Sequence, residues 1–164
     1  STGVGGRIGS TFELTRLLTG EASIGYQQRA YDDARLKELR GLVGDASLVW
    51  AATPLTTVTL RAGSELGDTT VPGVSGALNR LIALEVAHAF RRNWIVAGFA
   101  GLQRQDIGGG TIKEDTYQLG VRTEYKLTRT TSVRASFTHE RLKSATPGSD
   151  STANIVLVGL RLQL

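Results

Sequence analysis

The sequence predicts an all-β fold, an antiparallel up-and-down transmembrane β-barrel to which this chain contributes about nine strands. In Thr116–Leu164, apolar and polar residues alternate with a period of two over three successive segments. The polar positions of these segments carry arginine and glutamate of mixed sign, and the connections between predicted strands alternate between short and long. An apolar exterior, a charged interior and alternating connection lengths are typical of outer-membrane barrels.

The composition is compatible with this fold and excludes several other classes of protein. The length of 164 residues predicts one domain, an outer-membrane barrel domain over 1–164. No run of roughly 18 apolar residues is present, which excludes a helical membrane span. The chain has no cysteine, so it has no disulfide or thiolate metal site. The net charge of +4 arises from basic residues that alternate with acidic ones, so no nucleic-acid partner is expected.

The first half of the chain predicts four strands, each with one apolar side. They cover 7–15, 22–30, 42–51 and 57–65. A tight turn at Leu17–Gly20 joins the first pair. Thr53–Thr56 joins the second pair and places Pro54 where a missing amide proton costs least. Long polar connections are expected at Tyr31–Arg40 and Leu66–Gly76.

The second half predicts five more strands. They cover 79–89, 94–105, 117–127, 133–140 and 156–164. Short turns are expected at Arg91–Asn93 and Thr128–Thr131, and long loops at Arg104–Asp115 and Lys143–Ser151. The strand at 94–105 has apolar residues on both sides, so its lipid-facing side is left open.

The alternation of connections assigns a side of the membrane to each end of the strands. Outer-membrane barrels have short periplasmic turns and long external loops, and a complete single-chain bacterial barrel has an even number of strands. With nine strands, the first would begin outside the cell. We therefore expect the chain to be the carboxyl-terminal part of a larger, even-stranded barrel, with the number of upstream strands left open. The absence of an initiator methionine agrees with this expectation.

Two sets of residues follow from the alternation. Charged residues at the polar positions would line the lumen, where water or mutual pairing must satisfy them because an unpaired buried charge costs several kcal/mol. The predicted lumen-lining residues are Arg7, Glu13, Arg29, Asp45, Arg61, Glu65, Glu85, Arg122, Glu124, Lys126, Arg134, Glu140 and Arg161. Aromatic residues near the strand ends would form two interfacial girdles. They are Trp50, Phe90, Trp94 and Tyr125 near the short turns, and Tyr26 and Tyr117 toward the long loops.

The candidates for catalysis or cofactor binding are weak. His139 and Glu140 have opposite parity and point to opposite faces of a strand, and His88 lies among apolar residues near a short turn. We expect interfacial rather than catalytic roles for both histidines. Gly108–Gly110 is not followed by the lysine of a phosphate-binding loop. Asp32–Asp33 and Asp106 are candidates for surface cation binding, although solvated loop charge is the favoured interpretation. The sequence therefore predicts no catalytic residue, no metal site and no cofactor.

Several segments resemble the putative β-barrel porin type 2 family of Gram-negative outer membranes. They are Gly25–Asp33, Leu36–Lys37, Gly44–Leu48 and Thr53–Leu60. The ending Gly159–Leu164 is similar to the signal that the barrel assembly machinery reads, but it closes with leucine instead of an aromatic residue and is preceded by Leu157 where a polar residue is common. The resemblance implies a barrel in the bacterial outer membrane, in contact with outer-membrane lipid and with the assembly machinery during insertion. Further outer-membrane or periplasmic subunits are possible partners.

Three functional interpretations remain open from the sequence. The first is a porin-like passive conduit for polar solutes, and the resemblance suggests exopolysaccharide as one cargo. The second is a structural or partner-binding barrel without transport, and the third is a soluble β-sandwich. The total strand number separates the first two, because barrels of about sixteen strands hold an aqueous channel whereas those of eight to ten are filled by side chains. Mixed charge in an open lumen predicts weak ion selectivity.

Overall fold

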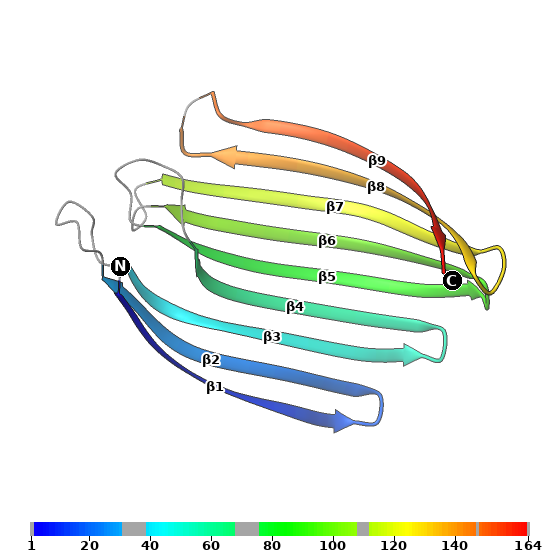
Figure 1. Cartoon of the computed structure of the whole chain (residues 1–164), viewed down its shortest axis with the longest axis horizontal. Helices are drawn as coiled ribbons and strands as arrows, with labels where there is room; N and C mark the ends of the chain where they lie inside the picture. The colour runs from blue at the N-terminus through cyan, green and yellow to red at the C-terminus, as the bar shows by residue number, and fades with distance from the viewer. Residues whose placement is uncertain (1, 31–38, 68–75, 108–111, 147, 164) are drawn as a thin grey trace.

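The chain forms one antiparallel sheet of nine strands arranged in sequence order (Figure 1). The computed structural model describes residues 2–30, 39–67, 76–107, 112–146 and 148–163. The strands are β1 (Thr2–Thr15), β2 (Leu18–Ala30), β3 (Leu39–Thr53), β4 (Thr56–Gly67), β5 (Ala77–Arg91), β6 (Trp94–Ile107), β7 (Ile112–Lys126), β8 (Thr131–Ser144) and β9 (Ser151–Leu162). Within these residues, no helix is long and apolar enough to cross a membrane.

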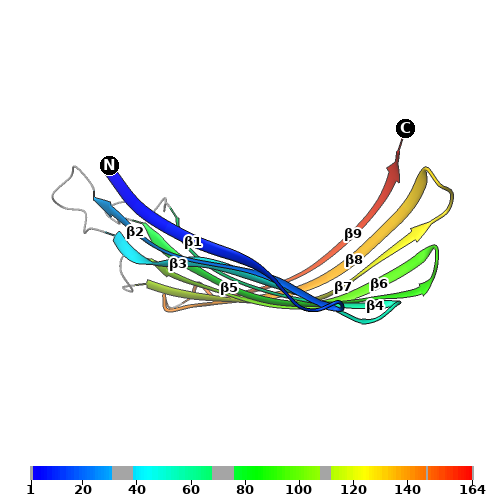
Figure 2. The ribbon, with the colours of Figure 1, turned by 90° about the horizontal axis from the view of Figure 1, so that it is seen from below.

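The sheet is a single curved layer and is not closed into a cylinder. Figure 2 shows that β1 and β9 rise at opposite edges of an open trough. The short turns gather at one end, where β9 ends, and β1 begins at the other end (Figure 1). One sheet without a second layer to cover it contradicts the β-sandwich interpretation of the sequence. The up-and-down topology predicted from the sequence is confirmed.

Three of the short turns share the same construction. The strand register shifts just before each of them, between Glu13 and Thr15, between Ala51 and Thr53, and between Ala89 and Arg91. At the first two turns, a threonine Oγ1 accepts a hydrogen bond from the backbone amide two residues on, with a length of 3.2 Å in both cases. These side chains supply acceptors that the tight backbone of a turn lacks, which favours a turn at these positions.

The strands are longer than the alternation pattern predicts. β1 begins at Thr2 rather than Arg7, and β2 begins at Leu18, so the turn between them is shorter than expected. The loop predicted at Arg104–Asp115 is also too long, because β6 and β7 stay paired up to Ile107 and Ile112, which are register partners. β8 likewise runs to Ser144. Pairing with a neighbour holds glycine-rich and charged segments in the sheet although their own β propensity is low.

The sheet has almost no buried core. Among the described residues, the buried hydrophobic ones are Ala77, Ala97 and Ile107. Large aliphatic side chains are instead exposed, including Ile8 at 76%, Leu119 at 62% and Val158 at 74%. Exposed apolar area of this extent marks a surface that another apolar medium covers.

Candidate functional site

The strand register divides the side chains between two faces of the sheet. Residues directly opposite one another in an antiparallel pair project to the same side. One such row joins Arg61 on β4, through Ala83 and Gly101, to Gln118 and Glu140. When the same procedure is applied to every pair of strands, all thirteen charged residues predicted to line a lumen fall on one face. We call this the polar face, and the opposite side the apolar face.

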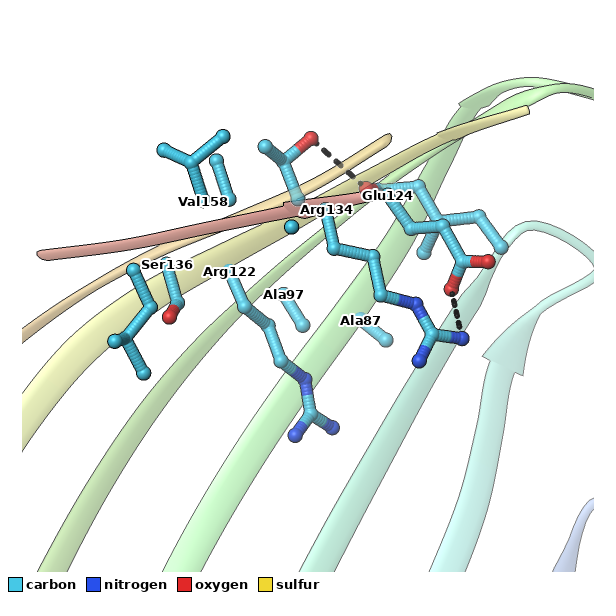
Figure 3. Close-up of a pocket in the computed structure, with 12 residues that line it drawn as sticks. Ala87, Ala97, Arg122, Glu124, Arg134, Ser136 and Val158 are labelled. Atoms are coloured by element: carbon cyan, nitrogen blue, oxygen red, sulfur yellow. Dashed lines mark hydrogen bonds and ion pairs between the residues drawn. The ribbon is translucent and has the colours of Figure 1, made fainter. Parts of the chain in front are cut away.

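The polar face is the concave side of the sheet. A hollow of about 590 Å³ lies on it and is bounded by residues of five neighbouring strands, β5 to β9. In Figure 3 the side chains of Arg122 and Arg134 project to one side of the sheet, whereas Val158 points to the other. Smaller hollows over β1–β3 and β4–β7 are also lined mainly by polar-face residues, such as Glu13 and Arg61. A hollow that spans several strands forms where the sheet bends around it, which identifies the inside of the trough.

Two ion pairs on the polar face reach across an intervening strand. Arg122 of β7 pairs with Glu85 of β5, and the β6 residue in register with Arg122 is only an alanine, Ala97. Arg7 of β1 similarly crosses β2 to Asp45 of β3, with 2.7 Å between Nη2 and Oδ1. Arg122 lies beside Ala97 of the middle strand, and Arg7 lies beside Gly25, so the register partner of each arginine on the middle strand is small. The concave curvature brings the partners within reach.

A third pair joins adjacent strands, because Arg134 and Glu124 are direct register partners with 3.1 Å between Nη2 and Oε2. Glu140 accepts a hydrogen bond of 2.9 Å from the Gln118 amide. The arginine side chains of the three ion pairs are about half exposed, so water reaches them. Other charged residues share the polar face without an ion pair to any described residue. They are Glu13, Arg61, Glu65, Lys126 and Arg161.

The exposure of these pairs predicts a small contribution to stability. We expect Glu124→Gln to lower the free energy of unfolding by less than about 1 kcal/mol, as is typical of solvent-exposed ion pairs. Urea unfolding of the full-length protein in lipid, followed by tryptophan fluorescence, measures this change. A loss above about 2 kcal/mol would instead mean that the pair is dry in the assembled protein.

The six aromatic residues predicted as girdles all lie on the apolar face and are exposed. At the short-turn end, Trp94 is the register partner of Tyr125. The ring centroids of Trp94 and Phe90 are 5.3 Å apart. The indole Nε1 of Trp94 donates a hydrogen bond of 2.8 Å to Thr123 Oγ1. The register also settles the orientation of β6, because its even-numbered residues from Trp94 to Leu102 lie on the apolar face.

Both histidines lie on the apolar face and contact neutral polar groups. His88 Nδ1 is 2.9 Å from Thr56 Oγ1, and His139 Nδ1 is 2.8 Å from Asn154 Oδ1. Among the described residues, no three His, Cys, Asp or Glu side chains are grouped as metal ligands would be. Asp106 pairs with Arg80 at 2.9 Å. The candidates Asp32–Asp33 and Gly108–Gly110 lie outside the described residues.

Some charged residues were missed because the sequence placed them in turns or loops. Glu21 and Glu114 also lie on the polar face, since β2 and β7 begin earlier than predicted. On the apolar face, Arg104, Asp115 and Lys143 occupy one register row beyond the apolar residues. The alternation of side chains continues beyond the predicted ends of the strands. Extending the predicted strands by a few residues would therefore have assigned these charged residues to their faces.

Comparisons with known proteins agree with this geometry. No curated protein is a significant match to the chain. The crystal structure of the siderophore receptor PirA from Pseudomonas aeruginosa is similar in fold, with a TM-score of 0.62 and 17% sequence identity. The alignment covers 96% of this chain but 31% of the receptor. The family model described as putative beta-barrel porin 2 matches residues 1–164. The chain is thus a β-barrel membrane protein and belongs to the putative beta-barrel porin 2 family.

Proposed function

We propose that the protein is a porin-like passive conduit for polar solutes in the bacterial outer membrane. The observation that carries the proposal is the concave polar face, where ion pairs such as Arg122–Glu85 and Arg134–Glu124 are reached by water. A lumen lined by such groups must be hydrated, because dry unpaired charges would cost several kcal/mol each. A hydrated lumen is the physical requirement for passage of polar solutes.

The slant of the apolar face supports a membrane-spanning orientation. On β9 the apolar residues of the apolar face begin, on the long-connection side, at Val156. The register row that contains Val156 crosses the sheet through Val86 and Leu18 and reaches β1 at Thr15. On β1 the apolar face continues to Val4, about ten residues further toward the long connections.

This displacement corresponds to a strand tilt. Ten residues span about 33 Å along a strand, and eight strand steps span about 38 Å across the sheet, which gives a tilt of about 40°. Outer-membrane barrel strands tilt by roughly 35–45°. At this tilt the apolar length of β1 rises about 25 Å, which is the height of a barrel's lipid-facing band.

The open edges of the sheet support a barrel wider than nine strands. In hydrocarbon the unpaired backbone groups along β1 and β9 cannot remain exposed, so both edges need pairing partners in the membrane. Nine strands still form an open trough (Figure 2), so their curvature fits a barrel with more than nine strands. The lumen widens as strands are added, which favours an aqueous channel over a filled interior.

Conductance of the full-length protein in planar bilayers tests the proposal. We expect stepwise currents with weak ion selectivity in the wild type. The double substitution Arg122→Glu with Arg134→Glu should shift the reversal potential toward that of cations, because it places negative charge on the polar face. The matched control, Arg92→Glu with Arg129→Glu, makes the same charge change beside the short turns and should leave selectivity unchanged.

Two results would contradict the conduit. An absence of current steps from correctly folded protein would favour the structural or partner-binding barrel. Equal shifts of the reversal potential in the two double variants would mean that the polar face does not line the path of the ions.

A further inference from the structure

The apolar face carries a band of charge at the long-connection end of β5–β8. Arg80, Arg104, Asp115 and Lys143 are successive partners in one register row across these four strands. The next row toward the loops pairs Asp106 with Lys113, and the next row toward the turns pairs Tyr117 with Arg141. We call these seven charged residues the cationic rim. With five basic and two acidic members, its net charge is +3.

Both carboxylates of the rim are bound to arginines, while the basic residues remain accessible. Arg104 contacts Asp115 through two hydrogen bonds of 2.7 and 3.0 Å, and Arg80 Nη1 lies 2.9 Å from Asp106 Oδ2. The two acidic side chains are 24% and 15% exposed, whereas the two arginines are 50% and 53% exposed. The acids therefore hold the guanidinium groups in place and leave other N–H donors free for a ligand.

The remaining three basic residues add positive charge and form no ion pair with a described acid. Lys113 and Arg141 are exposed and form no ion pair with a described residue. Lys143 is exposed, with Nζ 5.8 Å from the centre of the Tyr117 ring. Unpaired cations beside one another repel, so an anion that bridges them is stabilised on this surface.

The rim begins where the apolar surface ends. Directly on the turn side of Arg80 and Arg104 lie Ile82 and Leu102, which face the same side of the sheet. A protein spanning the membrane in the proposed orientation would place this boundary among the headgroups of the outer leaflet, at the long-loop end.

We propose that the cationic rim binds the phosphate groups of a phosphorylated glycolipid in the outer leaflet. This inference rests on the proposed membrane orientation but not on conduction through the lumen. Guanidinium forks bind phosphate oxygens through paired hydrogen bonds, and lysine supplies a compact charge beside them. Cations on four adjacent strands, spaced about 4.8 Å apart, can reach more than one phosphate of the same headgroup.

Native mass spectrometry of the full-length protein in detergent, titrated with lipid A that carries two phosphates, tests the rim. Arg80→Gln, Arg141→Gln and Lys143→Gln together should weaken binding by about 100-fold, because each basic residue near an anionic lipid contributes roughly fivefold. Lipid A with one phosphate should bind the wild type more weakly than the diphosphorylated form. Added salt should weaken binding, because the rim is exposed.

Two controls separate this site from general charge effects and misfolding. Arg91→Gln, Arg92→Gln and Arg129→Gln together remove the same charge at the opposite end of the strands and should leave lipid binding unchanged. Arg80→Lys with Arg141→Lys keeps the charge but loses the guanidinium forks, so it should lose less affinity than the first triple variant. Unchanged binding in the first triple variant, equal losses in both triple variants, or a loss in the lysine variant as large as in the first triple variant would each overturn the proposal. Planar-bilayer conductance of the same variants reports separately on the lumen.

Discussion

Val121→Arg is expected to lower the free energy of unfolding in a bilayer by about 2–4 kcal/mol, the cost of a cation at the lipid-facing midplane of a barrel. Val121 lies on the apolar face near the middle of β7, and its side chain is 44% exposed. In the membrane this exposed area meets hydrocarbon, which cannot solvate a guanidinium group. Equilibrium unfolding by urea from vesicles of the full-length protein measures the loss.

The matched control is Gln118→Arg, an arginine on the same strand but on the polar face. Gln118 already donates to Glu140 at 2.9 Å, so an arginine at this position gains an acidic partner and stays in water. We expect a change in unfolding free energy of less than about 1 kcal/mol. Equal losses for the two variants, or a larger loss for the control, would mean that the two faces have been assigned to the wrong environments.

The second large effect is expected at Gly120 on β7. A Cβ atom added at this position would lie 2.5 Å from the Phe137 carbonyl oxygen and would also overlap the Phe99 ring, which lies over the glycine. Since a backbone atom cannot move aside cheaply, Gly120→Ala should lower the unfolding free energy by about 1–3 kcal/mol, the usual cost of overpacking. The same unfolding assay in vesicles measures it.

Gly98 on β6 provides the control for this substitution. A Cβ atom at Gly98 meets nothing within 4 Å, and the residue lies on the apolar face opposite Val121. Gly98→Ala should therefore stabilise the protein by about 0.4–1 kcal/mol, because alanine restricts the unfolded chain. A similar loss at both positions would show that the contact around Gly120 is not the cause of the effect.

The sequence predicts the faces of the sheet better than the extent of its strands. In β7, Arg122, Glu124 and Lys126 lie on one side and Leu119, Val121 and Tyr125 on the other, and this period of two identifies a two-sided strand without reference to its neighbours. The orientation of β6 could not be decided in this way, because Ala97, Phe99 and Gly101 on its polar face are not polar. The register of β6 with β5 and β7 shows which of its sides belongs to the polar face, which its own composition does not indicate.

Contacts within the site depend on strands that are distant in the sequence. That Arg122 lies on the polar face follows from local alternation, but its pairing with Glu85 depends on the register of three strands and on the curvature over Ala97. The cationic rim was missed for a different reason. Arg104 and Asp115 flank a glycine-rich segment, and the density of polar residues there favours a loop until the pairing partners are known.

Each described strand bonds only to the strands that precede and follow it in the chain. Among the described residues, no backbone pairing joins strands that are not consecutive in the sequence. A hairpin can therefore be duplicated or deleted in the gene without changing how the other strands pair. Evolution can thus alter the diameter of such a protein two strands at a time, while every hairpin keeps the same alternation of apolar and polar residues.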